Sequence, residues 1–116
     1  MDTSIELIKL LLPEILVTYF KLTKHEVKNG ELHFFFTELN IIPEEFKTLK
    51  LSSKGFFPEA TVQDFPIRGK KVFLHIIRRR WLEEKSKKVL TRDWQLVAKG
   101  TRITSEFATF LKQISQ

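Results

Sequence analysis

The segment with the clearest chemical potential is a run of three arginines, Arg78, Arg79 and Arg80, followed directly by Trp81. The run ends an apolar, β-branched stretch over residues 72–77, which is typical of a strand. On a strand, neighbouring side chains point to opposite faces, so Arg78 and Arg80 share one face while Arg79 joins Trp81 on the other. A ribbon with cations on both faces indicates either a partner of opposite charge or a well-solvated β-surface.

The positive charge of the chain is concentrated around this run. The chain has 116 residues and a net charge of +6, but residues 68–102 alone carry 12 Lys/Arg against 3 acids. The remaining residues have a net charge of −3. Cations that neutralise a line of phosphates release counterions and give affinity without sequence preference. The residues predicted to contact DNA are Arg68, Lys70, Lys71, Arg78, Arg79, Arg80, Trp81, Lys85, Lys87, Lys88, Arg92 and Arg102.

Catalysis is not predicted from these residues. The histidines, His25, His33 and His75, have no metal-ligand spacing, and His33 and His75 lie in strand-like segments where a hydrogen-bonded structural role is expected. No serine has a nucleophile-elbow context, and no glycine-rich phosphate loop is present. The chain has no cysteine, which excludes disulfides and thiolate metal sites. We expect a protein that is not an enzyme and has no cofactor or metal.

The elements expected around the basic run give an α+β fold, an antiparallel sheet flanked by helices at both ends of one domain over residues 1–116. Helices are predicted at about 4–20, with a break at Pro13, and at about 105–115, where the apolar face is Phe107, Phe110, Leu111 and Ile114. Asn29-Gly30 predicts a hairpin turn between residues 21–28 and 31–39. Strands are expected over 49–57 and 60–65, and residues 67–70 turn the chain into the basic segment.

The basic segment itself is expected to be a long β-hairpin, about residues 71–82 and 88–98. Leu90, Arg92, Trp94 and Leu96 alternate on one face of its second arm. Trp81 and Trp94 have two interpretations: packing across the strands, which would stiffen the ribbon, or stacking on unpaired bases. A two-stranded ribbon also fits a major groove, where an arginine can read guanine.

Three segments taken together are similar to a known family. They are residues 62–70 (VQDFPIRGK), residues 72–81 (VFLHIIRRRW) and residues 100–104 (GTRIT) leading to Phe107. The set resembles the N-terminal region of bacterial insertion-sequence transposases, in which a zinc-ribbon-like module precedes a helix-turn-helix and a DDE catalytic domain. The resemblance implies that residues 48–102 form the zinc-ribbon-like region, between residues 1–47 and a helix at 103–116. It matches Arg68, Gly69 and Lys70 to the family's turn, and the arginine run to its arginine-aromatic segment.

Two departures from the family pattern change what the resemblance implies. Residues 82–88 stand where the family has a Cys-x-x-Cys knuckle, and without cysteine no zinc can be held there in the family's manner. Trp81 and Trp94 are then candidate replacements for the metal. The chain looks like a cysteine-free subgroup encoded as a separate short frame. It also lacks the downstream catalytic carboxylates, so we do not expect it to cut DNA by itself.

The function expected from this pattern is that of a non-catalytic DNA-binding accessory module of a transposase, contacting the double-stranded ends of the element through the basic hairpin. The alternative is a module that docks on a catalytic transposase chain, or on a second copy, through its apolar helices. RNA binding through Trp81 and Trp94 is a third possibility. The first residues contain Asp2 and Glu6 rather than a basic start, so we expect no signal peptide, no membrane contact and a bacterial cytoplasmic location.

Overall fold

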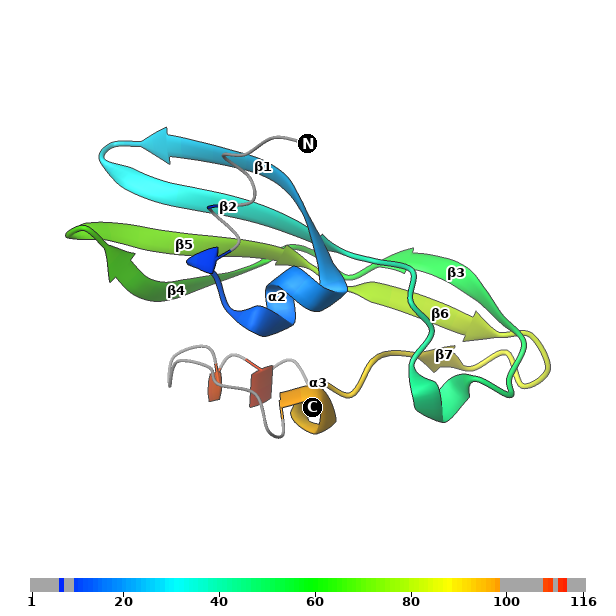
Figure 1. Cartoon of the computed structure of the whole chain (residues 1–116). Helices are drawn as coiled ribbons and strands as arrows, with labels where there is room; N and C mark the ends of the chain where they lie inside the picture. The colour runs from blue at the N-terminus through cyan, green and yellow to red at the C-terminus, as the bar shows by residue number, and fades with distance from the viewer. Residues whose placement is uncertain (1–6, 8–9, 99–107, 110, 113–116) are drawn as a thin grey trace.

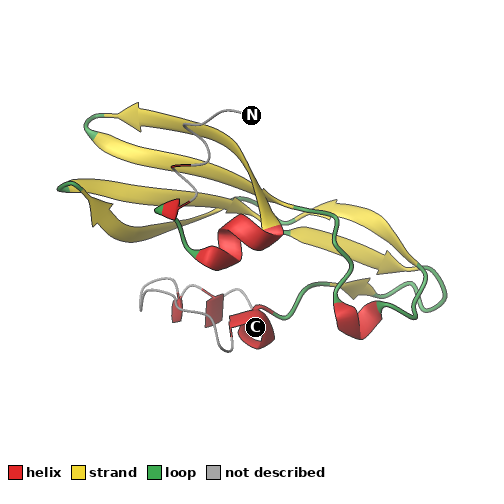
Figure 2. Cartoon of the chain, viewed as in Figure 1, coloured by secondary structure: helices red, strands yellow, loops and turns green. Residues whose placement is uncertain are grey.

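The computed structural model describes residues 7, 10–98, 108–109 and 111–112, and it is built mostly from β-strands. Two sheets lie one after the other along an elongated body of 49 × 30 × 24 Å (Figure 1). The secondary-structure view shows the small share of helix (Figure 2). None of the described helices is long and apolar enough to cross a membrane.

The larger sheet has four strands in the order β1-β2-β5-β4. These strands are β1 Phe20–Lys28, β2 Glu31–Glu38, β4 Ala60–Ile67 and β5 Lys70–Ile77. The predicted hairpin at Asn29-Gly30 is confirmed, with φ of 53° and 74° at the two turn residues, and β1 pairs antiparallel with β2. The turn at Arg68-Gly69 between β4 and β5 is also confirmed and has the same pair of positive φ angles.

The smaller sheet has the order β3-β6-β7, with β3 Leu51–Phe56, β6 Arg79–Glu83 and β7 Val89–Leu90. A single turn of 3-10 helix, η1 Glu44–Phe46, precedes β3. Strands β5 and β6 are separated by Arg78 alone, and together they run along the long axis from one sheet into the other (Figure 1).

The core lies on one face of the larger sheet. Alternate residues of β2 and β5 point to it, and α2 Glu14–Tyr19 and α3 Trp94–Ala98 pack against it (Figure 1). The buried apolar residues of this cluster are Leu12, Ile15, Leu16, Phe20, Phe34, Phe36, Val72, Leu74, Ile76, Trp94 and Leu111. The period-2 alternation of the strands therefore leaves His33, Phe35, Phe73 and His75 on the opposite face.

The predicted fold class, α+β with helices at both ends, is wrong. The described part of the expected helix at 4–20 contains α2, which has six residues, and strand β1 already begins at Phe20. The sheet is also mixed rather than antiparallel, because β2 and β5 pair in parallel. Helical spacing of apolar residues before Phe20 was outweighed by strand pairing from Phe20 onward, since burial against a neighbour overrides local propensity. The expected helix at 105–115 lies mostly outside the described residues.

The predicted long basic hairpin is also wrong. Its first arm is divided between β5 and β6, which belong to different sheets, because β2 ends at Glu38 and the chain after Arg78 pairs with β3 instead. Its second arm is β7, two residues long, followed by α3. Asp93 accepts a hydrogen bond from the Leu96 N–H at 3.2 Å, which is the contact of a helix N-cap. The Asp-Trp-Gln-Leu segment thus starts a helix where alternation had indicated a strand.

Candidate nucleic-acid interface

The middle arginine of the run holds the two sheets together. The Arg79 backbone N–H donates to Glu38 Oε1 at 2.8 Å, and its side chain donates to the Glu38 carbonyl at 3.3 Å and to Ser53 Oγ at 3.1 Å. The guanidinium also lies over the Phe56 ring, 4.8 Å from its centroid. Arg79 therefore bridges the end of β2 and the second half of β3, and its donors are directed at this chain.

The flanking arginines share one aromatic partner. The guanidinium carbons of Arg78 and Arg80 lie 4.4 and 5.4 Å from the centroid of the Phe57 ring, and Arg80 donates to the Lys54 carbonyl at 3.4 Å. Both side chains are half-buried. Burial lowers the pKa of Arg78 from its ordinary value, and the charge of Glu38 acts in the opposite direction. The pairing of Arg78 and Arg80 on one face was correctly predicted, but that face packs on Phe57.

Arg92 is enclosed in the protein and does not reach solvent as a DNA-binding residue would. Its exposed fraction is 7%, and its Nε donates to Glu38 Oε2 at 3.2 Å. Its terminal nitrogen donates to the Ile41 carbonyl. Three aromatic rings surround the guanidinium at 4.6 to 5.9 Å, those of Tyr19, Trp81 and Trp94. The prediction that Arg92 contacts DNA is therefore wrong for this conformation.

The two tryptophans are structural. Trp81 is 1% exposed and its indole N–H donates to Asn40 Oδ1 at 2.9 Å. Trp94 is 2% exposed and stacks on Phe20, with the ring centroids 5.1 Å apart. Neither tryptophan has an exposed ring face on which an unpaired base could stack. The prediction that Trp81 contacts nucleic acid, and the alternative of single-strand binding through both rings, are therefore wrong. The packing interpretation holds in a different form, since Trp94 lies on α3 and not on a facing strand.

The remaining predicted contact residues are exposed, and they lie at opposite ends of the body. Arg68 lies in the β4–β5 turn, and Lys70 and Lys71 begin β5 directly after it, at the far end of the larger sheet. The β6–β7 loop lies at the other end of the molecule (Figure 1). That loop carries Lys85, Lys87 and Lys88. The cations therefore form two separate groups and not one ribbon. Arg102 lies outside the described residues.

Several acids at or near the surface are paired with this chain's own side chains. Glu26 pairs with Lys24 at 3.2 Å, and this hydrogen bond lowers the pKa of Glu26. Glu44 pairs with Lys47 at 2.6 Å. Hydrogen bonding to the Ser52 side chain, with help from Lys87, lowers the pKa of Glu84. Lys24, Lys47 and Lys87 are therefore paired with acids of this chain.

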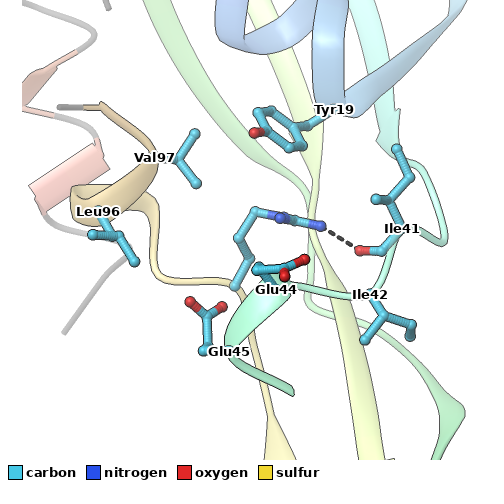
Figure 3. Close-up of a pocket in the computed structure, with 8 residues that line it drawn as sticks. Tyr19, Ile41, Ile42, Glu44, Glu45, Leu96 and Val97 are labelled. Atoms are coloured by element: carbon cyan, nitrogen blue, oxygen red, sulfur yellow. Dashed lines mark hydrogen bonds between the residues drawn. The ribbon is translucent and has the colours of Figure 1, made fainter. Parts of the chain in front are cut away.

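A cleft of about 430 Å³ opens between α2, the β2–η1 connection and α3 (Figure 3). Its lining is largely apolar, with two glutamates and the edge of Arg92, and it comprises Tyr19, Ile41, Ile42, Glu44, Glu45, Arg92, Leu96 and Val97. Ile41, Ile42 and Leu96 are 44%, 40% and 51% exposed. Of the apolar face predicted for the C-terminal helix, Leu111 packs in the core, and Phe107, Phe110 and Ile114 lie outside the described residues.

One pair of residues in the structure was missed by sequence reasoning. His33 Nδ1 lies 2.8 Å from His75 Nε2 on the face of the larger sheet that is turned away from the core. The two histidines are 42 residues apart, and the parallel pairing of β2 with β5 brings them together. The signal was present as two His/Phe alternations, His33-x-Phe35 and Phe73-x-His75, but their register depends on a crossover that no local pattern encodes.

Comparisons with protein-family models, with characterised proteins and with solved structures gave no match. The resemblance to transposase N-terminal regions therefore depends on the sequence motifs and remains a prediction.

Proposed function

We propose that this chain is a non-catalytic module that binds double-stranded DNA through phosphate contacts at both ends of its elongated body. The observation that supports this is the position of its free cations. Arg68, Lys70 and Lys71 at one end, and Lys85 and Lys88 at the other, are exposed and form no ion pair with any described residue. In line with the motifs it resembles, the module serves a catalytic transposase chain by holding the ends of the element.

The separation of the two groups suits a duplex. Strands β5 and β6 run nearly in line, so Lys71 and Lys85 are about 45 Å apart at the usual rise of a strand. Phosphates on one strand of B-DNA are spaced by about 3.4 Å, so this reach corresponds to roughly 13 base pairs. A protein lying along the duplex would then contact phosphates more than one helical turn apart.

The test is duplex binding as a function of salt, measured by fluorescence anisotropy with a 20-base-pair duplex. We compare three double variants with the same change of charge: Lys70→Glu with Lys71→Glu, Lys85→Glu with Lys88→Glu, and, as a control, Lys21→Glu with Lys24→Glu on β1. Each phosphate contact contributes about 0.9 to the slope of log affinity against log salt. We expect either end variant to reduce the slope by about 2 and the control to leave it nearly unchanged.

Two further comparisons make the test specific. A duplex of 6 base pairs is too short to contact both end groups at once. We therefore expect the parent protein to bind it with the salt slope that an end variant shows on the long duplex. Mutating one end group should then change this binding little, because the other group can still hold the short duplex. Duplexes taken from the ends of the neighbouring element, compared with scrambled duplexes, test the link to transposition. Equal binding by the parent and both end variants would refute the DNA interface.

The second candidate function is docking on a catalytic transposase chain or on a second copy. Three exposed apolar side chains at the cleft, Ile41, Ile42 and Leu96, favour it, because exposed apolar surface around a cleft often marks an interaction site. Sedimentation over a range of concentrations, with and without the catalytic chain, tests this function. Replacing Ile42 with Glu should abolish association while leaving DNA binding intact.

A further inference from the structure

The β4–β5 end of the molecule exposes an aromatic ring as well as cations. Phe65, near the end of β4, is 63% exposed, more than any other aromatic side chain of the described residues, and it makes no ring or cation–π contact with them. The next most exposed ring, Phe56 at 40%, is covered by the guanidinium of Arg79. A single exposed apolar side chain is ordinary on a protein surface, so the significance of Phe65 depends on its surroundings.

A β-bulge places Phe65 outside the regular ladder between β4 and β5. The pairs on either side are out of register by one residue, so Phe65 and Pro66 together stand opposite Lys71. Proline lacks the N–H that a ladder needs and is confined in sheets to outer strands and bulges. The two residues are both exposed, which interrupts the alternation along β4. Because β4 is an outer strand of the larger sheet, no described strand lies beyond the ring.

The residues around the ring carry positive charge. Arg68 follows in the turn, Lys70 begins β5, and Lys71 is the residue opposite the bulge. All three are exposed and form no ion pair with any described residue. Asp64 is the one acid within residues 62–71, and its Oδ1 is buried. An apolar ring among free cations suits a polyanion that also offers apolar surface, as stacked bases between two rows of phosphates do.

Double-stranded DNA offers this combination in its minor groove. Proteins that bind there insert apolar side chains, phenylalanine and proline among them, between base steps and use arginine and lysine in the same groove. The groove is about 6 Å wide, so a side chain that enters it has a phosphate backbone on either side. Phe65 and Pro66 are of the residue types that act as wedges, and the three free cations lie within six residues of Phe65.

We propose that Phe65 is a wedge that enters and unstacks a base step of the bound duplex at the β4–β5 end. This inference rests on the proposed DNA-binding function and adds a preference to it. The cations hold any duplex, whereas the wedge selects steps that unstack easily, and unstacking costs least at a mismatched pair. The loop at the other end, residues 84–88, contains no apolar residue, so that end makes phosphate contacts only.

The experiment compares a matched 20-base-pair duplex with the same duplex carrying one T·T mismatch five base pairs from an end, by fluorescence anisotropy at fixed salt. The two probes have the same charge, so a difference between them reports unstacking and not phosphate contacts. We expect the parent to bind the mismatched duplex roughly fivefold more tightly or better. Phe65→Ala should bind both duplexes within about twofold of each other, and its salt slope should equal that of the parent because no cation is lost.

Two controls show that the preference belongs to the wedge. Leu96 is also an exposed apolar residue, at 51%, but it lies on α3 at the cleft, so Leu96→Ala should keep the affinity and the preference of the parent. The double variant Lys85→Glu with Lys88→Glu, at the opposite end, should weaken binding to both duplexes by the same factor and keep the preference.

Phe65→Trp supplies a direct readout of stacking. The ring is exposed, so neither this variant nor Phe65→Ala should disturb the fold, which circular dichroism checks. Trp81 and Trp94 are buried, so the introduced indole is the one that solvent reaches among the described residues. We expect the variant to keep the mismatch preference, and its fluorescence to be quenched by DNA and shielded from acrylamide.

The outcomes separate this inference from the proposed function. A parent that binds duplex with a steep salt slope, without mismatch preference and with the same affinity as Phe65→Ala, would refute the wedge and leave DNA binding standing. A parent that binds neither duplex would refute both. Vesicles of equal parts phosphatidylcholine and phosphatidylglycerol test the other anionic surface that takes aromatic rings among cations. If Phe65→Ala weakens binding to these vesicles and leaves DNA binding unchanged, the β4–β5 end is a membrane contact and the wedge is overturned.

Discussion

Glu38 and Arg92 form a buried ion pair across 54 residues of sequence, with Arg92 Nε donating to Glu38 Oε2 at 3.2 Å. The two side chains are 1% and 6% exposed, and the second carboxylate oxygen of Glu38 accepts the backbone N–H of Arg79. The pair lies where β2 ends and the smaller sheet begins. Arg92, which the sequence predicted to contact DNA, is thus part of the junction between the sheets.

The first prediction concerns this pair. Replacing Arg92 with Met keeps the length of the side chain but leaves the Glu38 carboxylate buried without its cation. Removing one member of a buried pair costs roughly 3–5 kcal/mol of unfolding free energy, which urea denaturation at pH 7 measures. Arg68→Met, at the exposed β4–β5 turn, is the control and should change stability by less than about 0.5 kcal/mol. A fully stable Arg92→Met variant with weakened DNA binding would contradict this assignment.

The second prediction concerns pH. Desolvation raises the pKa of Glu38 above its ordinary value, against the opposing hydrogen bonds from Arg79 and Arg92. Between the unfolded and the folded pKa the native state binds more protons, so its stability falls as the pH rises through this window. Glu38→Gln cannot titrate, and its unfolding free energy should lack this fall. Denaturant midpoints of both proteins at several pH values from 4 upward provide the comparison; parallel curves would show that Glu38 does not titrate abnormally.

The elements that the sequence predicted well are those that depend on neighbouring residues. Asn29-Gly30 determined its hairpin because positive φ at both turn residues is a local requirement. The parallel pairing of β2 with β5 depends on a crossover through the smaller sheet, and no local pattern specifies it.

The candidate site was harder to predict for the same reason. Charge composition correctly marks residues 68–102 as basic, but composition does not show which guanidinium groups have partners within the protein. Glu38 receives hydrogen bonds from two of the predicted contact residues, Arg79 and Arg92, and nothing near Glu38 in sequence indicates it. Lys70 and Lys71 remain candidate contacts because they are exposed at the start of β5, directly after a tight turn that offers few partners.

The third prediction concerns the two tight turns. Gly30 and Gly69 have φ of +74° and +77°, and a Cβ at either position would meet no other atom within 4 Å. The cost of alanine there is therefore backbone strain alone, roughly 1 kcal/mol at each turn. Thermal or urea unfolding of Gly30→Ala and Gly69→Ala measures it. Asn29 also has a positive φ, of 53°, so Asn29→Gly relieves the same strain and should not destabilise the hairpin. If Asn29→Gly lowers the unfolding free energy as much as Gly30→Ala does, side-chain contacts and not φ determine these turns.

The last prediction separates structural from DNA-binding cations. Arg79→Gln removes the hydrogen bonds to Ser53 Oγ and to the Glu38 carbonyl that join the sheets, so we expect a loss of roughly 1–3 kcal/mol in unfolding free energy. Its affinity for duplex DNA, measured under conditions where it is fully folded, should change by less than twofold. Lys71→Gln makes a matched change of charge at an exposed position and should do the reverse, leaving stability unchanged and reducing the salt slope of binding by about 0.9. If both variants lose DNA binding to the same extent, Arg79 reaches the phosphates despite its internal partners, and the division of the basic segment into an inner and an outer set of cations fails.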